Sequence, residues 1–340
     1  MGWISLIKSY IQLVTVVFSL FVNSIFIFLV VTESPKKLGN YKHLMCYFSF
    51  ISMVYAILDY IVQPYIHSYR ASFSMLMDLK GSAFENNPTV AFFVTASLTG
   101  CFASTIYAIS INFVFRYFAL QREGRLRYFS GKRLYLWISI PFLSGIAWVT
   151  NNWFLFSPNP EMTEYLRAEV KELYDLDADK MTYTGCLYWR TDANGNIYLS
   201  KKDLIGAFNL MIIMMIPFFT ILYFGSKSYS KITKLMSQGE SDYSRKLQMQ
   251  LYKALVAQTL IPMVFLFIPV GIFFTSPLIG VNIEWTSFII TFFYSFYPAV
   301  DPIPIIMLID EYRNAFFNFF RRAMSKNQVV SVVSIDLNYT

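Results

Sequence analysis

The chain has 340 residues, of which 56% are apolar and 14% are charged, and its formal net charge is +7. Soluble domains average about 25% charged residues, so this composition excludes an ordinary soluble domain and indicates a membrane protein. The basic residues gather in alternate loops, so the positive charge indicates a membrane orientation and not a nucleic-acid-binding surface.

Seven apolar stretches of 22 to 27 residues follow one another along the chain. About 20 helical residues cross the core of a bilayer, and the stretches lack the polar face that a soluble helix shows every 3.6 residues. Within them only Asp59 and Asp301 are charged. The sequence therefore predicts an all-α membrane protein, a bundle of seven transmembrane helices. The predicted spans are 10–31, 44–66, 89–115, 134–156, 204–225, 254–275 and 286–309.

The loops alternate in charge, and this alternation predicts the orientation. One set of loops holds 19 basic and 7 acidic residues, and the other set holds 9 basic and 12 acidic residues. Because cytoplasmic loops carry the excess of Lys and Arg, the first set is predicted inside, with the N-terminus outside and the C-terminus inside. The inner set is 32–43, 116–133, 226–253 and the tail after 309; the outer set is the N-terminus, 67–88, 157–203 and 276–285.

The longest outer loop, 157–203, carries its own structural signals. Interleaved charges predict a short helix over Glu161–Leu176. Aromatic and β-branched residues in Met181–Arg190 predict a strand that pairs with Ile197–Leu199 across a turn-rich stretch. This loop either covers a pocket that opens outward or is a solvated connector. A disulfide between Cys186 and Cys101 of the third span would require Cys186 to reach into the bundle, and it is left open.

The seventh span holds Asp301 beside three prolines, Pro298, Pro302 and Pro304. Proline removes a helical hydrogen bond, so this helix is the best candidate for a moving element. An ionisable group inside a membrane is costly and suggests a function. Asp301 is interpreted as a switch contact and Asp59 as a ligand or water contact, while the alternative for both is a hydrogen-bonded acid that joins two helices.

The inner ends of the third and seventh spans are also distinctive. Arg116 and Tyr117 close the third span, where Arg116 either reads out conformation to a partner or extends to the membrane interface. After the seventh span, apolar residues at helical spacing predict an eighth, amphipathic helix on the inner leaflet. Residues 1–324 then form one receptor domain and 325–340 a disordered cytoplasmic tail. The apolar face of the eighth helix is Tyr312, Phe316, Phe319, Phe320 and Ala323.

Together these features resemble the plan of G-protein-coupled receptors. Relative to rhodopsin-type receptors, Phe115 stands before Arg116 in place of an acid, and the sequence at 301–305 lacks the tyrosine of Asn-Pro-x-x-Tyr. The usual cysteine at the outer start of the third helix is also absent.

A closer resemblance, to the nematode serpentine chemoreceptors of the Str class, covers nearly the whole chain. It rests on LGNYKHLM at 38–45, FVFRYFA at 113–119, the segment 248–262, and YPAVDP at 297–302 with Tyr312 and Arg313 after it. This class includes the diacetyl odorant receptor, to which the chain is similar in length and loop pattern. The resemblance implies an olfactory receptor for a small odorant or soluble chemical. It would act in the plasma membrane of sensory cilia through a heterotrimeric G protein.

We expect the ligand pocket in the outer half of the bundle, where helices three, five, six and seven meet. Polar groups among apolar walls orient a small ligand, although such groups are also typical of helix packing. Arg116, Tyr117, Asp301 and Pro302 are the candidate switch and G-protein-coupling residues. The basic loops 121–133 and 227–253 complete that candidate surface. The candidate ligand contacts are Asp59, Thr95, Thr99, Cys101, Ser104, Asn152, Asn209, Phe273 and Thr291.

Other classes of membrane protein fit less of the sequence. A seven-helix odorant-gated channel of the insect type would place its N-terminus inside, opposite to the charge pattern. A transporter would typically show internal repeats and more intramembrane ionisable groups. The sequence has no Gly-rich phosphate loop and no His/Cys metal cluster, so no enzymatic activity, metal or cofactor is predicted. A receptor-like subunit that acts as a co-receptor is also compatible with these features.

Overall fold

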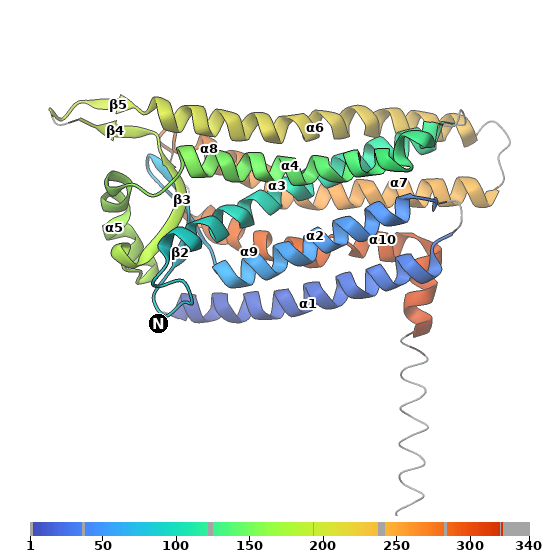
Figure 1. The fold of residues 1–340 in the computed structure, drawn as a ribbon, viewed down its shortest axis with the longest axis horizontal. Helices are drawn as coiled ribbons and strands as arrows, with labels where there is room; N and C mark the ends of the chain where they lie inside the picture. Colours follow the sequence, from blue (N-terminus) through green and yellow to red (C-terminus); the bar gives the residue numbers. More distant parts are fainter. Residues whose placement is uncertain are drawn as a thin grey trace, which may run out of the picture.

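The computed structural model describes residues 3–35, 38–121, 125–192, 194–236, 242–281, 284–319 and 321. Long helices run side by side along the length of the molecule (Figure 1). The N-terminus and the strands lie at one end, which we call the sheet end. The loops with the Lys/Arg excess lie at the other, which we call the basic end. The bundle helices are α1 (Trp3–Glu33), α2 (Tyr41–Val62), α3 (Pro88–Ala119), α4 (Lys132–Leu155), α6 (Lys201–Met236), α7 (Asp242–Pro262), α8 (Ile268–Thr275), α9 (Glu284–Val300) and α10 (Ile303–Leu308).

Among the described residues, five helices are long and apolar enough to cross a membrane: α1, α2, α3, α4 and α6. The two remaining predicted spans are helical but interrupted. A π-helical turn, Met263–Phe267, joins α7 to α8, and Pro269 follows it. In the last span a turn at Asp301 and Pro302 separates α9 from α10. Both interruptions occur at prolines, which remove helical hydrogen bonds.

The bundle is built around α3, the most buried of these five helices. Its tightest contact is with α4, where Gly100 and Gly145 face each other. A Cβ on Gly100 would lie 2.9 Å from the Gly145 carbonyl oxygen and 2.7 Å from the Val149 side chain. Small residues of this kind let two membrane helices approach closely. The contact fixes the distance between the two helices that carry Thr99 and Asn152.

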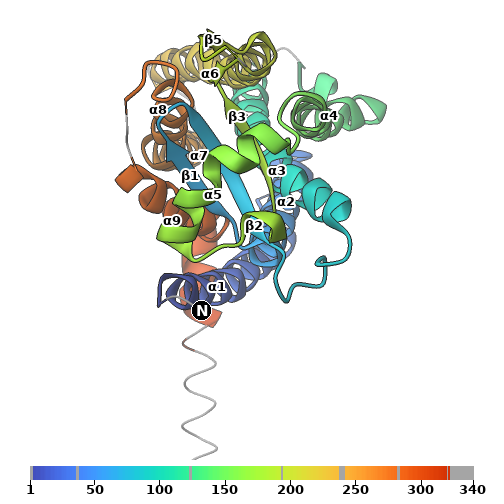
Figure 2. The ribbon, with the colours of Figure 1, turned by 90° about the vertical axis from the view of Figure 1, so that its left-hand side faces the viewer.

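A three-stranded antiparallel sheet covers the sheet end of the bundle (Figure 2). Its order is β1 (Tyr65–Tyr69), β2 (Ser72–Asp78) and β3 (Met181–Leu187), with β2 in the middle. Helix α2 ends before this sheet because Gln63 is left-handed, with φ 46°, and Pro64 follows it. Strands β1 and β2 follow α2, and β3 comes from loop 157–203, so two separate loops of this end form one sheet.

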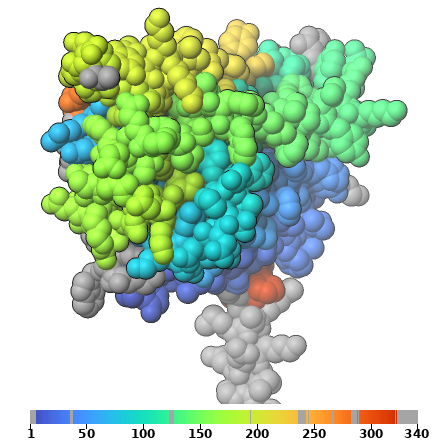
Figure 3. All heavy atoms as spheres, turned by 60° about the vertical axis from the view of Figure 1, so that its left-hand side comes forward, coloured from blue at the N-terminus to red at the C-terminus, as the bar shows by residue number. Residues whose placement is uncertain are grey.

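Helix α5 (Pro160–Tyr174) packs on the face of the sheet that points away from the bundle. Its buried residues Met162, Leu166, Val170 and Tyr174 recur every fourth position, which places them on one face. The Asn159 side chain caps the helix by accepting a hydrogen bond from the Met162 amide at 3.0 Å. We call β1, β2, β3 and α5 the sheet cap. Figure 3 shows residues of both loops forming one continuous surface over this end.

The structure corrects the predicted pairing within loop 157–203. The predicted helix is present as α5, but β3 pairs with β2 and not with 197–199. The predicted hairpin with Ile197–Leu199 is confirmed only for the end of the predicted strand: β5 (Ile197–Leu199) pairs with β4 (Trp189–Thr191), which includes Trp189 and Arg190. The stretch from Met181 to Arg190 therefore contains two strands, because its first half joins the buried sheet and its second half projects from it.

At the basic end, residues 310–319 are helical and turn away from the direction of the bundle (Figure 1). Tyr312 is fully buried against Phe26, with ring centroids 6.4 Å apart, while Phe319 is 55% exposed. The predicted amphipathic face is thus buried at its start and exposed at residue 319. Residues 320 and 322–340, which include the rest of this predicted helix and the predicted disordered tail, lie outside the described residues.

Candidate functional site

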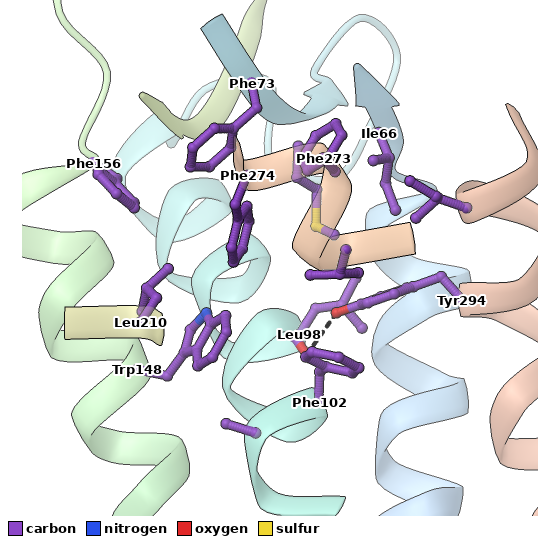
Figure 4. Close-up of a cluster of buried hydrophobic side chains, with 14 of the residues drawn as sticks. Ile66, Phe73, Leu98, Phe102, Trp148, Phe156, Leu210, Phe273, Phe274 and Tyr294 are labelled. Carbon is purple, nitrogen blue, oxygen red and sulfur yellow. Dashed lines mark hydrogen bonds between the residues drawn. The ribbon is translucent and has the colours of Figure 1, made fainter. Parts of the chain in front are cut away.

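A cavity lies directly beneath the sheet, within the helices of the sheet end (Figure 4). Its volume is about 60 Å³, which is room for about four water-sized groups. Helices α3, α4, α6, α8 and α9 and all three strands of the sheet contribute to its wall. The lining residues are Ile66, Phe73, Met75, Thr99, Phe102, Trp148, Asn152, Phe156, Thr184, Leu210, Val270, Phe273, Phe274, Ile290 and Tyr294.

Phe73 forms the aromatic roof of the cavity. It extends from β2 into the bundle, where its ring centroid lies 4.7 Å from Phe274, 5.4 Å from Phe273 and 5.7 Å from Phe156 (Figure 4). Because β2 is hydrogen-bonded on both sides, the backbone that carries this ring is held in place. The roof therefore couples the sheet cap to α8.

The sheet cap is itself tightly packed around a buried imidazole. His67 of β1 is 1% exposed, and its Nδ1 lies 3.1 Å from the Tyr174 hydroxyl of α5. Burial lowers the pKa of His67 from 6.5 to about 4. The imidazole is therefore neutral at physiological pH, and its protonation opposes closure of the cap.

Aromatic rings also form the floor of the cavity. The Phe102 ring of α3 lies 6.0 Å from Trp148 and 5.6 Å from Tyr294. The Tyr294 hydroxyl donates to the Leu98 carbonyl at 3.4 Å, as drawn in Figure 4. The floor thus joins α3, α4 and α9, so a ligand that rests on it contacts three helices together.

The polar groups on the wall are few and uncharged. Asn152 Nδ2 donates to Thr99 Oγ1 at 2.8 Å across the α3–α4 contact. Thr184, Tyr294 and the indole of Trp148 supply the other polar groups. None of the described residues that line the cavity is an Asp, Glu, Lys, Arg or His. Burying an unpaired charge here would be costly, so the cavity suits a small, uncharged, mostly apolar molecule.

A continuous set of contacts leads from the cavity floor toward the basic end. The Tyr55 hydroxyl of α2 donates to the Tyr294 carbonyl at 3.0 Å, and the Tyr55 ring lies 6.2 Å from that of Tyr297. Tyr297 in turn donates to Asp301 Oδ1 at 3.4 Å. Tyr294 and Tyr297 lie on neighbouring turns of α9. Tyr294 lines the cavity and Tyr297 contacts Asp301.

Asp301 is the centre of a hydrogen-bond network between three helices. Gln258 Nε2 of α7 donates to the Asp301 carbonyl at 2.8 Å and to its Oδ1 at 3.3 Å, and Ser52 of α2 donates to Oδ2 at 3.3 Å. A cavity of about 20 Å³ adjoins these groups, which is enough for about one water molecule. The network holds α7 against the break between α9 and α10.

Nearer the basic end, Arg116 joins α3 to α7. Its side chain is 2% exposed, and Nη2 donates to the Gln248 carbonyl at 2.9 Å and to Gln248 Oε1. Among the described residues no group accepts a hydrogen bond from its Nε. Tyr117, the next residue, packs on Phe224 of α6 with ring centroids 5.4 Å apart. We call the contact between Arg116 and Gln248 the α3–α7 latch.

Comparison with known proteins decides the family. Residues 8–317 match the family described as "Serpentine type 7TM GPCR chemoreceptor Str". The chain belongs to the Str family of seven-transmembrane chemoreceptors. It is 32% identical to "Serpentine receptor class r-10" of Caenorhabditis briggsae, over 88% of this chain and 86% of the relative, and 31% identical to the protein of that name in Caenorhabditis elegans, over 93% and 91%. It is 29% identical to "G-protein coupled receptor str-217" of Caenorhabditis elegans, over 87% and 85%.

Three of the predicted ligand contacts of this Str receptor line the cavity: Thr99, Asn152 and Phe273. Two others lie in helix contacts. Ser104 donates to the Gly100 and Pro141 carbonyls at 3.1 and 2.9 Å, and Asn209 donates to Asn151 at 3.2 Å. The structure therefore places Ser104 between α3 and α4, and Asn209 between α4 and α6.

Thr95 and Cys101 also lie away from the cavity wall. Thr95 is fully buried and donates to the Ala91 carbonyl at 2.9 Å. Cys101 packs against the apolar cluster around the cavity. Cys186 lies in β3 of the sheet cap and belongs to the same apolar cluster, and both cysteines are free thiols.

Asp59 and Thr291 belong to a second polar region of this Str receptor, between α1 and α9. Thr291 lines a groove there with Lys8 and Gln12, and Asp59 is buried behind it. Helix α1 therefore contributes polar groups that the sequence did not point to, because Lys8 lies before the predicted start of the first span.

The roof of the cavity was not predicted from the sequence of this receptor. Phe73 and Met75 lie in a predicted loop for which no strand was expected, and Thr184 lies in a strand assigned to another partner. Ile66 was predicted at the end of the second span but belongs to β1. Gln248, which completes the α3–α7 latch, was not predicted as a partner of Arg116. A glutamine in a polar loop carries no distinctive sequence signal.

Proposed function

We propose that this Str receptor binds a small, uncharged odorant or soluble chemical in the cavity beneath the sheet. Binding would activate a heterotrimeric G protein at the basic end. The observation that carries the proposal is the set of contacts from Tyr294 through Tyr55 and Tyr297 to Asp301 and Gln258. It links the cavity floor to α7, whose Gln248 is hydrogen-bonded to Arg116 of α3.

The cavity supports a ligand of a few heavy atoms with an apolar body and one polar group. Its volume is about 60 Å³, and the rings of Phe73, Phe102 and Trp148 surround it. The amide of Asn152 supplies a polar contact that would orient the ligand. Larger or charged molecules would require the sheet cap to open.

The charge of the loops supports an orientation with the sheet end outside the cell. The 19 basic and 7 acidic residues of the predicted inner set, against 9 and 12 in the outer set, follow the positive-inside rule. In this orientation the cavity takes ligand from outside. Arg116 and Tyr117 lie at the cytoplasmic end of the bundle with the described parts of loops 121–133 and 227–253, and the helix over 310–319 lies against the inner leaflet.

Activation is a shift between two arrangements of α7 and α9. In the present arrangement the α3–α7 latch and the Asp301 network hold the basic end together. A ligand that contacts Tyr294 and Phe273 better when α8 and α9 have moved would favour the arrangement without the latch. Its effect is limited to its difference in affinity for the two states. The break at Asp301 and Pro302 is the natural hinge.

The relatives' names say that they are serpentine or G-protein-coupled receptors. On the resemblance to the Str class we propose the plasma membrane of sensory cilia as the site of action.

The test is G-protein activation in cells that express the chain with a nematode sensory Gα subunit, screened against small volatile and water-soluble metabolites. We expect the ligand-dependent increase in activity to be lost in Arg116→Ala and Asp301→Ala receptors that reach the cell surface, because both changes remove contacts that distinguish the two arrangements. Leu210→Phe, which narrows the cavity, should weaken the response. Leu222→Phe, on the lipid-facing side of the same helix, where Leu222 is 47% exposed, is the matched control. A ligand-evoked current that persists without G protein would contradict the proposal.

A further inference from the structure

A second recess lies between α1 and α9, separate from the main cavity. Its volume is about 280 Å³, and we call it the α1–α9 groove. Ile7 and Phe292 at its edges are 54% and 43% exposed, so it opens on the face of the bundle that meets lipid. It is lined by Ile7, Lys8, Ile11, Gln12, Tyr65, Ile66, Tyr174, Thr291, Phe292 and Ser295.

The groove has an unsatisfied polar floor. Gln12 is 2% exposed, and neither its Nε2 nor its Oε1 makes a hydrogen bond of normal geometry with a described residue. Asp59, 3% exposed, lies behind the groove wall within side-chain hydrogen-bonding reach of Gln12 and Ser295, and its Oδ1 makes no hydrogen bond of normal geometry with a described residue. Buried polar atoms are rarely left unpaired, so this floor is built to receive a hydrogen-bonding group.

The charges around the floor are balanced. Lys8 interacts favourably with Asp59, and its Nζ donates to the Gln63 carbonyl at 2.6 Å and lies 2.9 Å from the centre of the Tyr65 ring. A cationic ligand would be repelled by Lys8, and an anionic ligand would have to displace these existing contacts of Lys8 and would lie near Asp59. A neutral group that both donates and accepts, such as a hydroxyl, matches the amide of Gln12, whose Nε2 donates and whose Oε1 accepts.

We propose that the α1–α9 groove binds an uncharged amphiphile with a hydroxyl head, a long-chain alcohol or a sterol, drawn from the surrounding bilayer. The hydroxyl bonds to the side-chain amide of Gln12, which lines the groove, accepting from Nε2 or donating to Oε1. The apolar body lies against Ile7, Ile11 and Phe292. Entry is sideways from the lipid, so the ligand bypasses the sheet cap.

Occupancy of the groove is linked to the main cavity by shared walls. Ile66 of β1 lines both recesses. Helix α9 presents Ile290 and Tyr294 to the main cavity and Thr291 and Ser295 to the groove. A molecule that fixes β1 and α9 in the groove therefore changes the affinity of the main cavity, and the reverse holds equally.

The experiment uses the purified full-length receptor in phosphatidylcholine nanodiscs with a diazirine-bearing hexadecanol, and cross-linked peptides are located by mass spectrometry. We expect labelling of α1 and α9, competed by excess hexadecanol or cholesterol; the better competitor identifies the source of the hydroxyl. Gln12→Leu should weaken binding about tenfold, as expected for loss of one or two hydrogen bonds. Binding is measured without any ligand of the main cavity, so the result is independent of the proposed chemoreceptor function.

Thr15→Val is the matched control. Thr15 is on the same helix and buried, but its hydroxyl donates to the Ile11 carbonyl at 2.7 Å and does not line the groove. Labelling of the Thr15→Val receptor should equal that of the unaltered receptor. Equal labelling of the Gln12→Leu receptor would overturn the proposal. So would stronger labelling by the corresponding diazirine-bearing fatty acid, because the charge argument excludes an anionic head.

Discussion

The two ends of this receptor bundle are held together by different forces. Around the sheet-end cavity, aromatic rings such as Phe73, Phe102 and Trp148 pack closely, and the few polar groups are uncharged. At the basic end, directional hydrogen bonds from Arg116 and to Asp301 join the helices. Apolar packing selects a ligand by shape, whereas a hydrogen bond is either made or broken. We therefore assign ligand recognition to the apolar packing of the sheet end and switching to the hydrogen bonds of the basic end.

The largest effect is expected from the close contact of α3 and α4, on which the shape of the cavity depends. In Gly100→Ala the new Cβ would lie 2.9 Å from the Gly145 carbonyl oxygen and 2.7 Å from Val149, which should destabilise the receptor by about 3 kcal/mol. Thermal unfolding of the purified receptor measures this. Gly271→Ala is the control, because a Cβ there meets nothing within 4 Å. Equal losses in both variants would show that the contact is not special.

The sheet cap should loosen in acid. The pKa of buried His67 is about 4, below its ordinary value of 6.5, so between these values the unfolded cap binds a proton and the folded cap does not. Stability of the cap is complete above pH 6.5 and falls as pH drops through this window, by about 2 kcal/mol at pH 5. Hydrogen exchange in β1 and β2 should accelerate between pH 7 and pH 5, after correction for the intrinsic rate.

His67→Phe is the control for this pH dependence, since it keeps an aromatic ring beside Tyr69 and Tyr174. In that variant the corrected exchange should not change with pH. The same acceleration in His67→Phe would assign the effect to another group.

At the basic end, loss of the α3–α7 latch should raise basal signalling. Gln248→Leu removes the side-chain acceptor of Arg116 but leaves the backbone carbonyl. One hydrogen bond to a charged group contributes about 1.5 kcal/mol or more, so we expect basal G-protein activation to rise about tenfold. Gln250→Leu, whose side chain accepts from the Asp310 amide at 3.4 Å, is the neighbouring control. Unchanged basal activity in Gln248→Leu would show that this contact does not restrain the receptor.

The smallest effect is expected from the polar pair in the cavity. Asn152→Leu removes the donor to Thr99 and the orienting amide, which should raise the ligand concentration for half-maximal response about fivefold. The maximal response should stay the same, because the α3–α7 latch is untouched. A fall in the maximal response with an unchanged midpoint would instead assign Asn152 to the switch.

Five of the seven spans have a matching long apolar helix among the described residues. These helices could be predicted because a bilayer leaves a strong signature, namely apolar stretches about 20 residues long. The sheet could not. Its strands are buried on both faces, with Phe73 and Met75 toward the bundle and Leu76 toward α5, so the usual alternation of polar and apolar residues is absent. The partners β2 and β3 also come from different loops, and no local signal specifies that pairing.

The candidate site was also predicted only in part. Thr99, Asn152 and Phe273, which line the cavity, could be chosen as candidates because polar or aromatic side chains in the outer half of a span are conspicuous. Sequence alone could not show which face of its helix each occupies, and Ser104 and Asn209 turned out to face neighbouring helices. Arg116 and Asp301 stood out as charges within or beside apolar spans. Their partners, Gln248 and Gln258, are uncharged and did not.

The most direct test of the coupling between the two ends is the distance between the basic ends of α4 and α7, measured by spin labels with and without ligand. Labels at Tyr135→Cys and Lys253→Cys occupy exposed positions, in a receptor whose half-buried Cys46 and Cys101 are replaced by serine. We predict that a ligand found in the screen lengthens this distance, and that Leu210→Phe suppresses the change while Leu222→Phe does not. A ligand that activates the G protein while the distance stays constant would contradict the account.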